Sequence, residues 1–71
     1  MKSSELIKKI RSELCLTQEE FAHAISSTTT TVNRWENDKA TPNRMARTMI
    51  ADFCKNKGIA KSLIEAVSTI R

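Results

Sequence analysis

A stretch rich in hydroxyl side chains and free of charge extends from Ser26 to Asn33. Hydroxyl and amide groups can donate or accept hydrogen bonds at the edges of DNA bases, and threonine methyls can pack against thymine methyls. Cations follow, with Arg34 and then Lys39. Because phosphates attract cations while base edges are read by neutral donors and acceptors, this order of residue types favours recognition of a nucleic acid.

Two short helices are predicted to hold this stretch in place. Thr17 and Glu20 have the spacing of a capping box, in which each side chain accepts a hydrogen bond from a backbone N–H at a helix start. Leu16 and Phe21 have the spacing of the hydrophobic staple that accompanies such a start. Apolar residues recur at helical intervals on both sides of Ser26–Ser27, so a tight turn between two helices is predicted there.

The second of these helices is predicted to have two different faces. If Thr28 caps it, a helical wheel places Val32 and Trp35 together on the side that packs inward. Thr31 points partly inward, where its hydroxyl could bond the carbonyl of Ser27. The opposite, outward side consists of Thr29, Thr30, Asn33, Arg34 and Asn37.

The hydroxyl run over residues 26–31 also admits a second interpretation. Six consecutive Ser and Thr residues could form a disordered linker, and threonine is a poor helix former because its branched Cβ loses rotamer freedom. The run is short, however, and its length fits a turn followed by the first turn of a helix.

Composition predicts an all-α fold, a compact bundle of five short helices. Gly and Pro occur once each in 71 residues, and we expect the whole chain, residues 1–71, to form one domain. Twelve Lys and Arg against eight Asp and Glu give a net charge of +4, which favours an anionic partner. No apolar run approaches the ~18 residues of a membrane span, and no signal peptide is evident. We therefore expect a cytoplasmic protein without a membrane partner.

The remaining apolar residues outline three further helices. The first, about Ser4 to Leu14, carries an apolar stripe that includes Ile7 and Ile10. Pro42 suits the entry of another, which Asn43 or Thr41 caps and Gly58 ends. Its repeating pairs are expected to be buried, namely Met45, Ala46, Met49, Ile50, Phe53 and Cys54. The last helix, about Ile59 to Ile70, has more apolar surface than one-sided packing needs, so part of it could serve a partner subunit.

Catalytic and metal-binding groups are not apparent. Cys15 and Cys54 match no zinc spacing, and adding His23 would supply only three of four ligands. Both cysteines are expected to be small buried hydrophobes on apolar helical faces. His23 is expected at the surface, with no recognisable nucleophile or carboxylate beside it. We predict no metal, no cofactor, no small-molecule substrate and no enzymatic activity.

Three motifs in the segment from Leu6 to Cys54 have a family resemblance. They are Leu16–Ala22 (LTQEEFA), Thr31–Glu36 (TVNRWE), and Lys39 together with Pro42. With this spacing the chain resembles the phage repressor and Cro family of helix-turn-helix proteins, also called the xenobiotic-response-element (XRE) type. The resemblance implies a lambda-repressor-like DNA-binding domain whose helix-turn-helix covers about residues 17–36.

The resemblance also implies which residues contact double-stranded DNA. In this family the second helix of the motif enters the major groove and the first lies across the backbone. By position, base contacts are expected from Thr28, Thr29, Thr30, Asn33 and Arg34. Phosphate contacts are expected from Gln18, Asn37, Lys39, Thr41 and Arg44, with Arg47 a weaker addition.

Two further expectations come from the same resemblance. Arg11 and Glu36 occupy positions that pair in the family, so a partly buried salt bridge is predicted. Ser26 and Asp38 stand where glycine is usual in the family, and Ser27 replaces a usual apolar residue. If the left-handed geometry is kept at Ser26, it costs about 1–2 kcal/mol.

Together these features predict a sequence-specific transcriptional regulator, Cro-like or repressor-like, that binds a pseudo-palindromic operator as a homodimer. The alternative from a different functional class is an antitoxin or adaptor whose main role is to hold another protein through its terminal helix.

Overall fold

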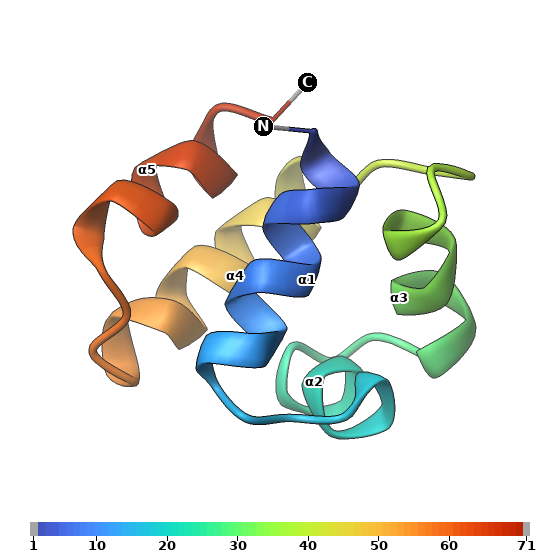
Figure 1. Ribbon diagram of the computed structural model, residues 1–71, viewed down its shortest axis with the longest axis horizontal. Coiled ribbons are helices and arrows are strands. Elements are labelled where there is room, and N and C mark those ends of the chain that lie inside the picture. Colours follow the sequence, from blue (N-terminus) through green and yellow to red (C-terminus); the bar gives the residue numbers. More distant parts are fainter. Residues whose placement is uncertain (1, 71) are drawn as a thin grey trace.

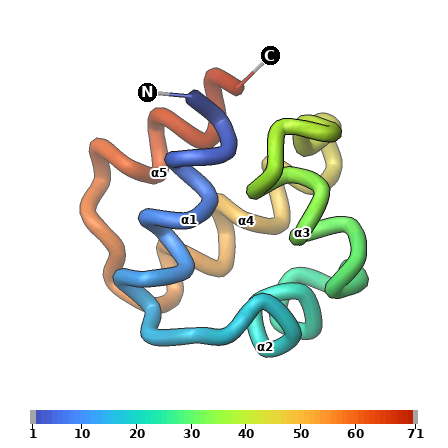
Figure 2. Tube along the Cα trace, turned by 45° about the vertical axis from the view of Figure 1, so that its right-hand side comes forward, coloured from blue at the N-terminus to red at the C-terminus, as the bar shows by residue number. Residues whose placement is uncertain are grey.

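The structure, a computed structural model, describes residues 2–70, which form five helices and no strand. The helices are α1 (Ser3–Glu13), α2 (Gln18–Ala24), α3 (Thr29–Glu36), α4 (Arg44–Asn56) and α5 (Lys61–Ser68). The predicted all-α fold is confirmed. Helices α1 and α4 lie in the middle, with α5 on one side, α3 on the other and α2 at one end (Figures 1 and 2). Within residues 2–70 no helix has the length and apolar character to cross a membrane.

Three helix starts are fixed by side chains that the sequence identifies. The Thr17 hydroxyl accepts from the Glu20 N–H at 3.1 Å, and the Glu20 carboxylate accepts from the Thr17 N–H at 2.9 Å. The predicted capping box is therefore present. Thr28 and Asn43 each accept from the backbone N–H three residues further on, at 3.2 and 2.9 Å. These bonds satisfy N–H groups that have no partner within the helix itself.

The first four helices all end with a residue in the left-handed conformation. These residues are Cys15 (φ 57°), Ser26 (φ 58°), Asp38 (φ 58°) and Gly58 (φ 73°). After each, the next N–H donates to the carbonyl five residues back, which is the Schellman arrangement. The four bonds run from Leu16 to Arg11 (3.1 Å), Ser27 to Ala22 (2.8 Å), Lys39 to Arg34 (2.9 Å) and Ile59 to Cys54 (3.0 Å). Only Gly58 adopts this conformation without the steric cost of a Cβ.

The threonine-rich segment belongs to the helix-turn-helix, so the linker interpretation is wrong. Thr28 caps α3, and Thr29 opens it. The Thr31 hydroxyl contacts Thr28 and not, as predicted, the Ser27 carbonyl. The Thr28 hydroxyl donates to the Thr31 hydroxyl at 2.9 Å.

All five helices contribute to or pack against one hydrophobic core. Its fully buried side chains include Ile7, Phe21, Val32, Ile50 and Val67. Helix α5 packs against both α4 and α1. Three apolar residues of the C-terminal segment are buried in the core, namely Ile64, Val67 and Ile70.

The predicted burial of Met45 and Met49 is wrong. Met45 is 76% exposed and Met49 is 37% exposed. Helix α4 buries Ile50, Ala51 and Cys54 in the core. The other helices therefore cover only part of its apolar stripe. The two methionines instead border a shallow hollow beside the turn at Ser26–Ser27.

The prediction for the two cysteines is half right. Cys54 is buried, and burial raises the pKa of its thiol. Cys15 is exposed, contrary to the prediction. It lies in the turn after α1 and not on the helical face, and its left-handed backbone directs it away from the core stripe.

Candidate nucleic-acid interface

The two faces of α3 are divided as the helical wheel predicts. Val32 and Trp35 are buried, with 0% and 4% of their surface exposed. The side chains on the other face and at its ends are all exposed: Thr28, Thr29, Thr30, Asn33, Arg34 and Asn37. Except for Arg34, these side chains carry neutral hydroxyl or carboxamide groups, and we call the surface formed by Thr28, Thr29, Thr30, Asn33 and Asn37 the α3 polar face.

Exposed cations lie on α3 and in the segment that follows it. Arg34 lies on α3 itself, Lys39 lies in the loop after it, and Arg44 opens α4. Thr41 in the same loop is also exposed, whereas Arg47 is half-buried. The loop and α3 occupy the same side of the molecule (Figure 2). A surface that joins neutral donors and acceptors to flanking cations suits base edges and phosphates respectively.

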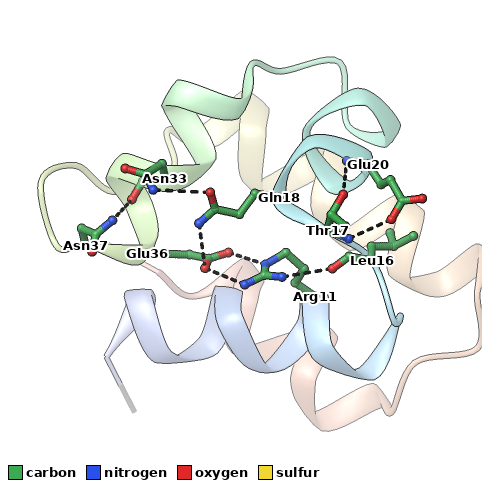
Figure 3. Close-up of polar contacts among 8 residues, drawn as sticks. All are labelled: Arg11, Leu16, Thr17, Gln18, Glu20, Asn33, Glu36 and Asn37. Carbon is green, nitrogen blue, oxygen red and sulfur yellow. Dashed lines mark hydrogen bonds and ion pairs between the residues drawn. The ribbon is translucent and has the colours of Figure 1, made fainter.

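Gln18 connects the start of α2 to the middle of α3. Its Nε2 donates to the Glu36 Oε1 at 3.2 Å, and its Oε1 accepts from the Asn33 Nδ2 at 3.4 Å (Figure 3). Gln18 and Asn33 are the residues for which phosphate and base contacts, respectively, are expected. The sequence does not indicate that they contact each other, because they are 15 positions apart in different helices.

A partly buried ion pair contacts Gln18. The Arg11 Nε donates to the Glu36 Oε2 at 2.7 Å, and the Arg11 Nη2 donates to the Glu36 Oε1 at 3.0 Å. Only 3% of the Glu36 side chain is exposed, against 26% for Arg11. The Arg11 Nη1 also donates to the Leu16 carbonyl at 3.0 Å (Figure 3). The pair thus joins α1, the turn after it and the end of α3.

Glu36 remains ionised in this position. Burial by itself would raise the pKa of its carboxyl, but the hydrogen bonds from Arg11 and Gln18 and the charges of Arg11 and Lys8 outweigh it. The result is a pKa below the ordinary value for glutamate. The hydrogen bond to Glu36 likewise raises the pKa of Arg11 against the opposing effect of burial. A charged, acceptor-only group therefore lies beneath the α3 polar face.

Asn37 supports the end of α3 as well as facing outward. Its Nδ2 donates to the Asn33 backbone carbonyl at 2.8 Å. The same carbonyl also accepts from the Asn37 backbone N–H at 3.1 Å, so the side chain adds a second hydrogen bond at the end of α3. The adjacent Asp38 places one negative charge in the loop among the cations.

The side chains of His23 and the two cysteines form none of the hydrogen bonds described above. His23 lies exposed on α2, as predicted, and both cysteines are free thiols. Residues 2–70 contain no group of three or more His, Cys, Asp or Glu side chains that could hold a metal ion.

Two short helices, a Schellman turn between them and an exposed polar face on the second define a helix-turn-helix DNA-binding protein. A family model described as Helix-turn-helix matches residues 7–45, which is more than half of the chain. The chain belongs to this family, the XRE type that includes phage repressors and Cro. Comparisons with curated proteins and with solved structures each found no match.

Proposed function

We propose that this protein is a sequence-specific transcriptional regulator of the Cro-like or repressor-like kind, acting on double-stranded DNA in the cytoplasm of a bacterium or a phage-infected host. The observation that carries the proposal is the exposed, neutral α3 polar face, together with exposed cations on α3 and in the segment after it. In this proposal residues 1–71 act as one DNA-binding domain, without enzymatic activity and without a cofactor.

The proposed roles follow the chemistry of each side chain. Base edges are contacted by Thr28, Thr29, Thr30, Asn33 and Arg34, which lie on or next to the exposed side of α3. Phosphates are contacted by Gln18, Asn37, Lys39, Thr41 and Arg44. Helix α3 enters the major groove, because the major groove admits an α-helix and presents a distinct pattern for each base pair.

We further propose that two copies bind a pseudo-palindromic operator as a homodimer. Two-fold symmetric dimers of helix-turn-helix proteins place their recognition helices about one DNA turn, ~34–36 Å, apart. A protein with a longest extent of 26 Å is small enough for two copies to lie side by side at that spacing. A monomer would provide only half of the contacts.

Selection from random duplex DNA tests this proposal. The protein is expected to enrich one pseudo-palindromic sequence, and sizing of the purified complex is expected to give two chains per duplex. Fluorescence anisotropy at several salt concentrations should give a log–log slope of about −0.9 per neutralised phosphate. Failure to enrich any sequence, together with a flat salt response, would rule out the regulator.

The alternative, an antitoxin or adaptor that binds through its terminal helix, has less support. The apolar residues Ile64, Val67 and Ile70 pack inside the core, which leaves that helix less apolar surface to offer. Recovery of a tight complex with another protein, combined with no selected DNA site, would favour this alternative over the regulator.

A further inference from the structure

The carboxamides of Gln18 and Asn33 are held in a defined orientation by a buried charge. A carboxamide has a donor end and an acceptor end, and neither backbone nor packing alone fixes which end faces a given neighbour. The orientation of the Gln18 carboxamide is set by Glu36, whose Oε1 lies 3.2 Å from the Gln18 Nε2. An ionised carboxylate only accepts hydrogen bonds, so Gln18 must turn its NH₂ group toward it.

Arg11 keeps Glu36 in that acceptor-only state. Its guanidinium contacts both carboxylate oxygens, at 2.7 and 3.0 Å, with 97% of the Glu36 side chain shielded from solvent. The two bonds also fix the plane of the carboxylate, because a guanidinium and a carboxylate match in a fork-to-fork arrangement.

The orientation of Gln18 then determines that of Asn33. With its NH₂ group toward Glu36, Gln18 presents Oε1 toward α3, and only a donor can satisfy this oxygen. The Asn33 Nδ2 occupies that position at 3.4 Å. One N–H of Asn33 is therefore engaged within the protein, which leaves its Oδ1 and its second N–H free of the contact with Gln18 on an exposed side chain.

This remaining pair of groups distinguishes the two purines. Adenine presents the N7 acceptor and the N6 donor in the major groove, and one N–H together with one carbonyl oxygen matches them. Guanine presents two acceptors, N7 and O6, which require two N–H donors. With one N–H already bonded to Gln18, Asn33 matches adenine and not guanine.

We propose that Glu36 is a positioning residue for base readout: through Gln18 it fixes the Asn33 carboxamide in the orientation that reads adenine. The inference rests on the proposed function and adds to it the identity of one base in each half-site. It also gives Gln18 two roles, since its second Nε2 hydrogen remains free for a phosphate.

Gln18→Met is the central variant for testing this chain of contacts. Methionine keeps the length of the side chain but removes both of its strong hydrogen bonds, and it leaves the Arg11–Glu36 pair intact. Asn33→Ala removes the proposed reader, and Arg44→Ala is the matched control that removes only a proposed phosphate contact. Each variant and the parent would be subjected to the same selection from random duplex DNA, after circular dichroism has confirmed its helical content.

The parent is expected to select adenine at one symmetry-related position with a preference of about 5- to 150-fold over other bases, as one bidentate contact provides. Asn33→Ala should lose that preference, Gln18→Met should lose most of it, and the double variant should lose no more than Asn33→Ala. Arg44→Ala should keep the preference and bind all sequences more weakly. Glu36→Gln, which can also donate, should relax the preference at the same position if it folds.

Several outcomes would overturn the inference. If the parent selects a site but Gln18→Met weakens binding equally at every position, Gln18 contacts phosphate only. If Asn33→Ala keeps the full adenine preference, Asn33 is not the reader. A folded Glu36→Gln variant with an unchanged preference would remove the role of Glu36. If the parent selects no sequence at all, the proposed function itself is wrong. The three preceding outcomes instead overturn only the roles of Gln18, Asn33 or Glu36.

Discussion

Arg11 and Glu36, 25 positions apart, form two hydrogen bonds that tie α1 to the end of α3. Glu36 is one of two buried polar residues among residues 2–70, the other being Ser4. The other ion pair in the described residues, Lys9–Glu13, is 4.0 Å long and about half exposed. Buried and exposed pairs differ in their effect on stability, because removing one partner of a buried pair leaves the other charge with neither a counter-ion nor water, whereas an exposed charge stays hydrated.

Arg11→Ala is expected to lower the free energy of unfolding by about 3–5 kcal/mol, since it leaves the Glu36 carboxylate buried without its cation. For a domain of this size the melting temperature should fall by about 12 °C or more. Glu36→Ala should cost less, because Arg11 is 26% exposed and its charge can reach water. Glu13→Ala, which breaks the exposed pair, is the control and should change stability by less than about 0.5 kcal/mol. Equal melting of Arg11→Ala and the parent would contradict the expectation.

Acid should remove the contribution of Glu36 to stability. Its pKa in the folded protein lies below the ordinary value of 4.5, so the stabilisation is fully present above that pH. It is lost as the pH falls through the folded-state pKa. The melting temperature of the parent, measured from about pH 7 to about pH 3, should therefore fall more steeply at the acidic end than that of Glu36→Gln. Parallel curves for the two proteins would show that Glu36 does not contribute.

Ser26→Gly is expected to stabilise the protein. Ser26 has φ 58°, a conformation that costs an L-residue about 1–2 kcal/mol. Glycine removes that cost but gains about 0.5–1 kcal/mol of entropy in the unfolded chain, so the net gain should be on the order of 0.5–1 kcal/mol. Ser27→Gly is the neighbouring control without a positive φ, and it should destabilise. Urea denaturation measures both, and a loss of stability in Ser26→Gly would mean that its Cβ is not strained.

Thr29→Ala and Thr30→Ala should reduce discrimination between the selected operator and random DNA while nonspecific affinity stays nearly constant. Arg44→Ala should weaken both kinds of binding alike and reduce the salt slope by about 0.9. The difference is expected because the proposed function assigns base contacts to the hydroxyls of the α3 polar face and a phosphate contact to the Arg44 cation. His23→Ala, exposed on α2, serves as the control with parental binding. Identical behaviour of the two threonine variants and Arg44→Ala in anisotropy titrations would remove this division.

Met45→Ala should change the free energy of unfolding by no more than about 0.5 kcal/mol, because Met45 is 76% exposed. Ile50→Ala, five residues later on the same helix, should cost about 2–5 kcal/mol, since Ile50 has no exposed surface and leaves a cavity. Comparable losses in the two variants would show that Met45 is covered in solution.

Most of the fold could be predicted from the sequence because its signals are local. The capping pair Thr17 and Glu20, the cap Thr28 and the terminating Gly58 each act within one helical turn. For α4 the sequence left Asn43 and Thr41 as alternatives, and the structure has Asn43 as the cap. The period of apolar residues likewise predicted which face of α3 is buried. Residue type could not predict that Cys15 would adopt a left-handed turn, because cysteine has no preference for that conformation.

The sequence by itself therefore determined the helices, their order and the neutral character of the α3 polar face, since these depend on interactions between near neighbours in the chain. The tertiary structure alone decided that Gln18 contacts both Asn33 and Glu36, and that Met45 lies outside the core. Such features depend on where two helices meet and on how much of each helix's apolar stripe is covered by the neighbouring helices. A one-dimensional pattern does not contain that information, because the packing of all five helices sets it.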